Sequence, residues 1–116
     1  MPSAQVPACV RIQLKPGSLA RVREWAAYIA AHREDALRTL QAEGVSVESV
    51  FLESSEDGDF LVYYMRTASL EKARAVAVQS TSAIDRYHQQ FKRECWAEVK
   101  RLELLVDIES CATRSV

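Results

Sequence analysis

The chain has 116 residues, of which 48% are hydrophobic and 27% are charged, a composition typical of one soluble globular domain with a single core. Its 15 basic and 16 acidic residues leave a formal net charge of −1, which argues against binding of nucleic acids or anionic membranes through a basic surface. No stretch has the length of apolar sequence that a membrane-spanning helix needs.

The first predicted element is a strand. Residues 1–7 contain two prolines and no periodic pattern, so we expect a flexible N-terminal arm there. Residues 8–14 alternate between two faces, with apolar side chains on one of them, which predicts a half-buried strand. The sequence Lys15-Pro16-Gly17 ends it, because proline removes a backbone donor and glycine permits a turn.

A long helix is predicted next, from the N-cap residue Ser18 to the helix-stopping residue Gly44. Apolar side chains recur at helical spacing between them, with Trp25 at the edge of the stripe. The polar stretch 31–35 predicts a kink or a short break. The stripe itself consists of Leu19, Val22, Ala26, Ile29, Ala36, Leu37 and Leu40.

A β-hairpin follows, built from two runs of β-branched and aromatic residues at 45–53 and 59–66. The polar turn between them contains Asp57-Gly58, a pair that suits the positive φ of a hairpin turn. The apolar residues of the first run change phase, which predicts a β-bulge near residues 48–49.

Two helical stretches are predicted after the hairpin, with Ser69 and Ser82 as their N-caps. Residues 79–82 separate them, because serine and threonine favour caps and turns over helix interiors. The apolar stripe of the later stretch consists of Ile84, Tyr87, Phe91 and Cys95.

A last strand is predicted over residues 99–108, where apolar and charged side chains alternate, and residues 109–116 form a C-terminal tail. The element order within residues 8–108 is therefore βαββαβ, which predicts a single ferredoxin-like domain of the α+β class. Right-handed crossovers place the first and third strands at the centre of a four-stranded antiparallel sheet, with the helices on one face.

The third strand is apolar on both faces, so it needs cover on two sides. The helices cover one face only, and an open apolar face usually marks an interface. We therefore expect a homodimer through the open sheet face. One face of this strand carries Phe60, Val62 and Tyr64, and the other carries Leu61, Tyr63 and Met65.

Four extended segments resemble a family of small bacterial proteins that is catalogued only as a domain of unknown function. These segments are 9–18 (CVRIQLKPGS), 43–52 (EGVSVESVFL), 58–65 (GDFLVYYM) and 84–92 (IDRYHQQFK). The resemblance spans roughly residues 8–106 and implies a ferredoxin-like fold of the dimeric α/β-barrel type. It brings no established activity, so it assigns no catalytic role to any residue.

His88 is the first catalytic candidate. An imidazole at the border of a helical apolar stripe can act as a general base, a proton donor or a ligand to haem iron. The alternative is a histidine that hydrogen-bonds a backbone group or a carboxylate and packs the helix. Tyr64 and Trp25 are the further catalytic candidates, as side chains that surround a cavity together with His88.

Five residues are candidates for ligand binding, because aromatic side chains with a few polar groups are typical of small-molecule sites. Aromatic residues at strand spacing are equally typical of a core or a dimer interface, and both interpretations stay open. The candidates are Arg11, Phe51, Glu53, Tyr63 and Met65.

Two more acidic residues, Glu48 and Glu103, are predicted to supply polar groups on the open sheet face. Arg11 and Glu103 could instead pair across adjacent strands, which would make them a cross-strand ion pair and no part of a site.

The sequence predicts no metal and no cofactor, since it has no cluster of metal-ligating residues and its three glycines are scattered. The three cysteines, Cys9, Cys95 and Cys111, are odd in number and widely spaced, which indicates free thiols in a reducing cytoplasm. The first residues have no basic and apolar pattern typical of a signal peptide.

These observations favour a small cytoplasmic homodimer without an assignable activity that binds a small apolar ligand between its two sheets. The alternative is a cofactor-independent monooxygenase or isomerase of the dimeric α/β-barrel type, with His88 in its cavity. The sequence does not decide whether the chain is an enzyme. It predicts no nucleic-acid or membrane partner.

Overall fold

The computed structural model describes residues 5–110 of the chain, and eight elements lie within them. The strands are β1 (Val6–Leu14), β2 (Val45–Ser55), β3 (Gly58–Thr67) and β4 (Trp96–Arg101). The helices are α1 (Leu19–Ala31), α2 (Arg33–Glu43), α3 (Leu70–Gln79) and α4 (Ala83–Cys95).

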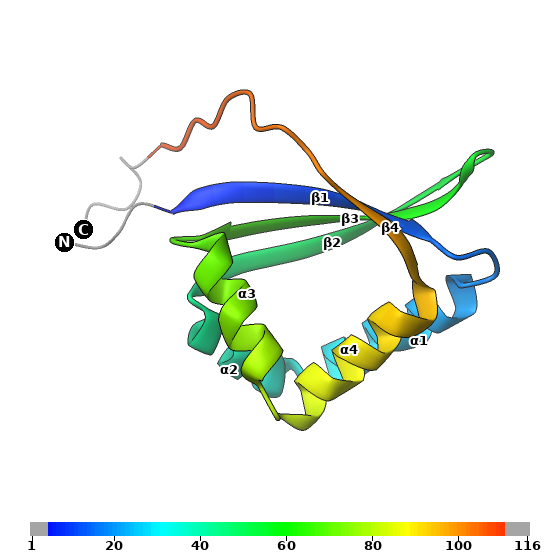
Figure 1. Ribbon diagram of the computed structural model, residues 1–116, viewed down its shortest axis with the longest axis horizontal. Helices are drawn as coiled ribbons and strands as arrows, with labels where there is room; N and C mark the ends of the chain where they lie inside the picture. Colours follow the sequence, from blue (N-terminus) through cyan, green and yellow to red (C-terminus); the bar gives the residue numbers. More distant parts are fainter. Residues whose placement is uncertain (1–4, 111–116) are drawn as a thin grey trace.

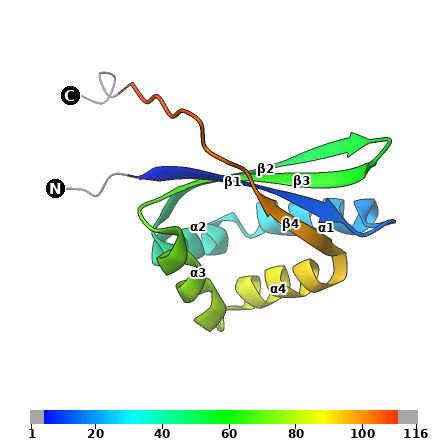
Figure 2. The same cartoon turned by 45° about the horizontal axis from the view of Figure 1, so that its top comes forward.

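The strands form one antiparallel sheet in the order β2-β3-β1-β4. All four helices lie on one face of this sheet, and the opposite face carries none (Figures 1 and 2). The predicted ferredoxin-like α+β fold is confirmed, with the first and third strands at the centre. β1 begins at Val6, so two residues assigned to the N-terminal arm belong to the sheet.

Both predicted breaks in the helical regions are present. His32 separates α1 from α2, and residues 80–82 separate α3 from α4. The side chains of Ser69 and Ser82 each accept a hydrogen bond of 3.2 Å from the third backbone N–H that follows, as N-caps do. Gly44 ends α2 with a φ of 75°, which suits a residue without a Cβ.

The β-bulge lies earlier in β2 than predicted. The register with β3 shifts between Val45 and Val47, so Ser46 is the extra residue, and residues 48–49 are regularly paired. As a result Glu48 lies opposite Met65 and Val50 lies opposite Tyr63. Residues opposite each other in an antiparallel pair share a face, so the position of this bulge decides which side Glu48 occupies.

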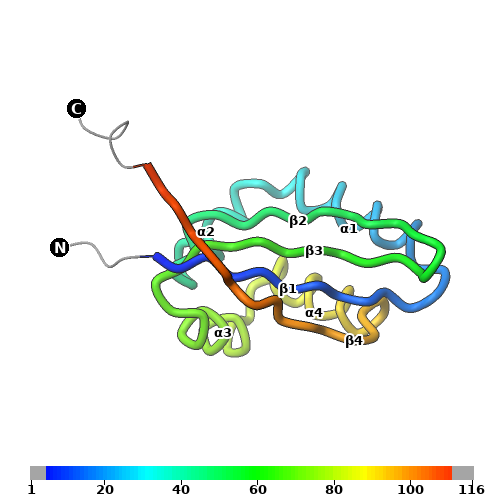
Figure 3. The backbone as a smooth tube through the Cα atoms, turned by 90° about the horizontal axis from the view of Figure 1, so that it is seen from above, coloured from blue at the N-terminus to red at the C-terminus, as the bar shows by residue number. Residues whose placement is uncertain are grey.

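The last strand is shorter than predicted, because β4 ends at Arg101 and not near residue 108. The Leu102 amide still donates to the Cys9 carbonyl at 2.9 Å, and the chain then leaves the sheet. Residues 102–110 cross over the open face in front of β1 and β3 (Figure 3). An ion pair of 2.7 Å between Arg66 and Asp107 holds this segment across β3.

The core fills only one half of the space beneath the sheet, where α1 packs against α4. Ile12 and Phe91 are fully buried there, and the Phe91 ring stacks on Trp25 with centroids 4.6 Å apart. Trp25 is 7% exposed, so it belongs to the core, whereas Ala26 of the predicted stripe is exposed. The cluster consists of Ile12, Leu14, Val22, Trp25, Leu61, Tyr63, Phe91 and Cys95.

The substitution Phe91→Ala tests this assignment of the core. It removes a fully buried ring and leaves Trp25 without its stacking partner, so we expect the free energy of unfolding to fall by about 3–5 kcal/mol. Urea unfolding followed by circular dichroism measures the change. The control Val78→Ala, at a side chain 80% exposed on α3, should change stability by less than about 0.5 kcal/mol. A loss below about 1 kcal/mol for Phe91→Ala would contradict the assignment.

Candidate functional site

A cavity of about 690 Å³ occupies the other half of the space between the sheet and the helices. All four helices and all four strands contribute to its wall, which is largely apolar. Small-molecule sites are commonly cavities of this size with a few polar groups. On the sheet side the apolar lining consists of Ala8, Val10, Val47, Val50, Tyr63, Met65, Trp96 and Val99.

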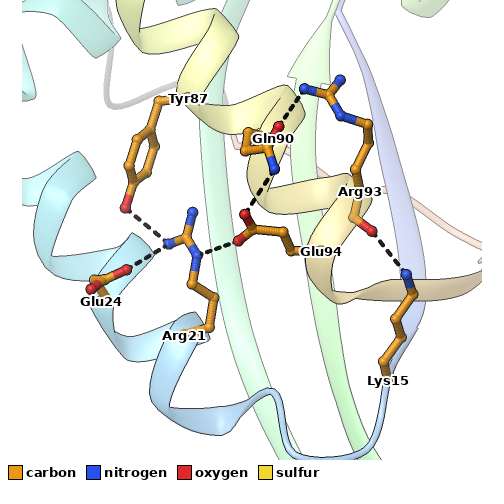
Figure 4. Close-up of polar contacts among 7 residues, drawn as sticks. All are labelled: Lys15, Arg21, Glu24, Tyr87, Gln90, Arg93 and Glu94. Carbon is orange, nitrogen blue, oxygen red and sulfur yellow. Dashed lines mark hydrogen bonds and ion pairs between the residues drawn. The ribbon is translucent and has the colours of Figure 1, made fainter.

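Polar contacts hold α1 against α4, the two helices that bring Trp25 and His88 to the cavity wall. Arg21 of α1 donates to the Tyr87 hydroxyl at 2.9 Å and to the Glu94 carboxylate at 2.7 Å, and it pairs with Glu24 at 3.1 Å (Figure 4). Gln90 donates to the other Glu94 oxygen at 2.8 Å, so the carboxylate is fixed from two sides. The rotation of α4 relative to α1 is therefore constrained by several bonds.

Trp25 and His88 meet across these two helices at the cavity wall. The Trp25 Nε1–H donates to His88 Nδ1 at 3.1 Å. An indole nitrogen can only donate, so Nδ1 must be the acceptor and the proton of the neutral imidazole lies on Nε2. Nε2 makes no hydrogen bond to any residue between 5 and 110, and His88 lines the cavity. The pair therefore supplies one N–H donor without a protein partner.

Burial lowers the pKa of His88 to about 4, and the positive charge of Lys92 acts in the same direction. The imidazole is accordingly neutral at physiological pH and cannot act as a cation there. A neutral imidazole with its proton fixed on one nitrogen is a hydrogen-bond donor to a developing negative charge.

The same hydrogen bond tests the hypothesis from the sequence that His88 could be a ligand to haem iron. A histidine binds haem iron through an unprotonated nitrogen, but Nδ1 of His88 is occupied by Trp25 and Nε2 carries the proton. Ligation through Nε2 would require the proton to move to Nδ1, where it would face the Trp25 N–H. The residues present therefore do not fit haem ligation by His88.

Four aromatic side chains, which we call the aromatic cluster, surround this part of the cavity: Trp25, Tyr63, His88 and Trp96. The His88 ring centroid lies 6.4 Å from that of Tyr63 and 6.2 Å from that of Trp96, and the last two are 5.5 Å apart. The Tyr63 hydroxyl and the Trp96 indole nitrogen are both buried and have no partner among residues 5–110. A buried donor without a partner costs about 1–3 kcal/mol, which a ligand or a bound water would recover.

Charged side chains line the cavity away from the aromatic cluster. Burial, together with the nearby negative charges of Glu48 and Asp85, raises the pKa of Glu43 to about 7. Burial also raises the pKa of Glu48 and lowers that of Lys92. The Lys92 ammonium lies 4.8 Å from the centre of the Trp96 ring. The cavity thus combines an apolar wall with carboxylates that hold protons more tightly than carboxylates in water.

Comparisons with known proteins agree with this architecture. Residues 6–113 match DUF6176, a family of unknown function. The chain belongs to this family. No curated protein matches the sequence of this DUF6176 member.

Several solved structures share the fold of the DUF6176 chain at low sequence identity. A protein from Nitrosomonas europaea described as a candidate antibiotic biosynthesis monooxygenase is 16% identical, with a TM-score of 0.52 over 88% of this chain and 89% of that one. A second such candidate, from Bacteroides thetaiotaomicron, is 13% identical, with a TM-score of 0.55 over 90% of each chain. Rv0793 from Mycobacterium tuberculosis is 18% identical, with a TM-score of 0.53 over 91% and 100%. These similarities establish the fold alone.

The structure brings together only some of the predicted site residues of the DUF6176 chain. His88, Trp25, Tyr63 and Met65 line the cavity. Tyr64 does not join them, because it follows Tyr63 in β3 and points to the opposite face of the sheet.

Arg11, Phe51 and Glu53 also lie on the open face, away from the cavity. The predicted pairing of Arg11 with Glu103 is wrong, because Arg11 pairs with Glu53 at 3.0 Å and stacks over the Phe60 ring at 3.6 Å. The cavity therefore lies between sheet and helices of one chain, whereas the ligand space predicted from the sequence lay between two sheets.

Three residues of the cavity were not singled out from the sequence as cavity residues. Trp96 and Lys92 were not among the predicted site residues, and Glu48 was placed on the open face. The available signal for Glu48 was its charge between Val47 and Val50, but the side that it occupies depends on the bulge at Ser46.

Two further findings concern residues 5–110 alone. No three His, Cys, Asp or Glu side chains in this range come together in a way that could hold a metal ion. No helix in the same range is long and apolar enough to cross a membrane.

The lowered pKa of His88 predicts a specific dependence of stability on pH. The unfolded chain takes up a proton at this residue near pH 6.5, whereas the folded chain does so only near pH 4. The contribution of the neutral imidazole to the free energy of unfolding is therefore fully present above about pH 6.5. It is lost as the pH falls toward 4, by about 3 kcal/mol in total.

Urea unfolding at several pH values should show this loss in the wild type and a smaller one in His88→Gln. The difference between the two proteins isolates His88, because the raised pKa values of Glu43 and Glu48 act with the opposite sign in both. His32→Gln, at a half-buried histidine between α1 and α2 that does not line the cavity, is the matched control and should keep the wild-type dependence. Parallel curves for wild type and His88→Gln would contradict the burial of a neutral imidazole.

Proposed function

We propose that the cavity binds a small, planar, largely apolar molecule that carries a hydrogen-bond acceptor, and that the protein is a cofactor-independent enzyme of the monooxygenase or isomerase type. The observation that carries this proposal is the Trp25–His88 hydrogen bond, which fixes a neutral imidazole N–H at the wall of an apolar cavity. The Nε2 atom is accessible to solvent, so a ligand in the cavity can reach this donor.

The shape and lining of the cavity support a planar ligand. Three rings of the aromatic cluster lie within 6.4 Å of one another, an arrangement that accepts another ring at its edge or face. The buried Tyr63 hydroxyl and Trp96 N–H favour a ligand with an oxygen atom at this end, because each lacks an acceptor within residues 5–110. The fold shared with candidate antibiotic biosynthesis monooxygenases is consistent with this proposal and does not carry it.

The two tryptophans of the chain make the ligand proposal directly testable, because both line the cavity. The ketone 2-tetralone serves as a planar, apolar probe with one acceptor oxygen. We expect its addition to ¹⁵N-labelled protein to shift both indole N–H resonances in an NMR titration. Native mass spectrometry of protein purified from its own cells would report any ligand retained from the cell.

Matched variants show whether the probe occupies the cavity. Val50→Phe places a ring in the cavity opposite Tyr63 and should weaken 2-tetralone binding by at least about tenfold, equivalent to about 1.4 kcal/mol. Val78→Phe makes the same change at an exposed position of α3 outside the cavity lining and should leave binding unchanged. Unshifted indole resonances at saturating probe, or equal binding by both variants, would count against a ligand cavity.

We also propose that the chain forms a homodimer through the open sheet face. Phe51 is 62% exposed on that face, next to the half-buried Val62 and Tyr64. The segment 102–110 adds more exposed apolar surface, since Leu105 and Ile108 are 85% and 87% exposed. Apolar surface of this extent on one side of a small domain favours association with a second copy.

Analytical ultracentrifugation at micromolar concentration tests the homodimer. The wild type should sediment as a dimer, and Phe51→Glu should shift it toward monomer, because a carboxylate would be buried without a partner. Val78→Glu introduces the same charge on the helix side of the domain and should remain dimeric. A monomeric wild type would rule out the homodimer.

A further inference from the structure

Glu48 has an unusual position in the cavity. Of the described residues that line it from the sheet, only Glu48 is charged. It shares a sheet face with Met65 directly opposite, and Tyr63 is its diagonal neighbour on β3 at ~7–8 Å. No ion pair within 4.0 Å engages its carboxylate among residues 5–110. The Glu48 side chain is exposed to water while it lines the cavity beside Tyr63 and Met65, so a ligand in the cavity can reach its carboxylate.

The surroundings of Glu48 favour a basic carboxylate. The cavity is open enough for water to reach the side chain, but protein on the other sides limits its solvation and raises its pKa, while Lys92 opposes the shift. A carboxylate with a raised pKa takes up a proton more readily and is a better general base near neutral pH. The titratable or charged side chains that face it from the helices are Arg33, Glu43, Arg74, Asp85, His88 and Lys92.

Glu48 and His88 occupy opposite walls of the same cavity, one on the sheet and the other on α4. Tyr63 is a diagonal neighbour of Glu48 on the sheet, and its ring lies 6.4 Å from that of His88. A planar ligand in the cavity would therefore meet a proton acceptor on one side and a fixed N–H donor on the other. This is the arrangement that enolisation requires.

We propose that Glu48 is the general base that removes a proton from an enolisable ketone or a phenol bound in this cavity, while the Nε2–H of His88 stabilises the oxygen that becomes negative. The inference rests on the proposed function, because it assigns the substrate class and the acid–base chemistry of the same cavity. Neither residue needs a metal or a cofactor for this step.

The step balances without any further reactant. The carboxylate of Glu48 forms an O–H bond with the substrate proton, and the electron pair of the broken C–H or O–H bond moves toward the substrate oxygen. The charge passes from Glu48 to an enolate or phenolate, which accepts a hydrogen bond from His88. Return of the proton to the same carbon or to another one regenerates Glu48, and the latter outcome is an isomerisation.

Hydrogen exchange into 2-tetralone in D₂O under nitrogen tests the proton transfer. Each enolisation replaces a hydrogen next to the carbonyl with deuterium, which ¹H NMR records as loss of signal. We expect the wild type to accelerate this exchange above buffer, with a rate that falls as the pH drops through the raised pKa of Glu48. Glu48→Gln should reduce the protein-catalysed rate by about 10²–10⁴-fold, the contribution typical of a general base.

Two control variants make the test specific. Glu56→Gln changes an exposed carboxylate in the β2–β3 turn, outside the cavity lining, and should keep the wild-type exchange rate. Glu43→Gln removes the neighbouring cavity carboxylate and tests whether that group, in place of Glu48, is the base. The indole N–H shifts must persist in Glu48→Gln, which shows that the variant is folded and still binds the probe.

The outcomes separate the two proposals. Binding of 2-tetralone without acceleration, equal rates for Glu48→Gln and the wild type, or loss of acceleration in Glu43→Gln alone would overturn the role of Glu48 and leave the ligand cavity intact. Failure of 2-tetralone to bind would contradict the proposed function and, with it, this inference.

Discussion

The side chain of Trp25 is part of both the hydrophobic core and the candidate site of this protein. One face of the indole stacks on Phe91 at 4.6 Å within the core, and its N–H reaches the cavity wall and donates to His88. Because an indole can only donate, this bond decides which imidazole nitrogen keeps its proton. The contacts of Arg21 with Tyr87 and Glu94 hold α1 and α4 in the relative position that the bond needs.

The domain is packed at one end and hollow at the other. The core beneath the sheet is closed by α1 and α4, whereas near α2 and α3 the same sheet faces a cavity of about 690 Å³. Glu43 and Glu48 lie in this hollow half, where burial raises the pKa of both. Because the packed half stabilises the fold, the other half can hold charged side chains whose burial in a core would be costly.

Much of the fold was predictable because its signals are local. The alternation in β1, the two-sided apolar β3 and the serine caps at Ser69 and Ser82 each depend on neighbours in sequence, and the structure agrees with them. The candidate site was less predictable. Its members come from several elements, and the sequence paired His88 with Tyr64, which the pleat of β3 directs to the other face.

The sequence by itself therefore determined the element order, the antiparallel sheet and the candidacy of His88 and Trp25, because periodicity and caps are properties of short stretches. Only the tertiary structure decided the contacts that make a site. It placed the bulge at Ser46, which turned Glu48 toward the helices, and it brought the Trp25 N–H to 3.1 Å from His88. Register and helix packing set these contacts, and both depend on residues far apart in the chain.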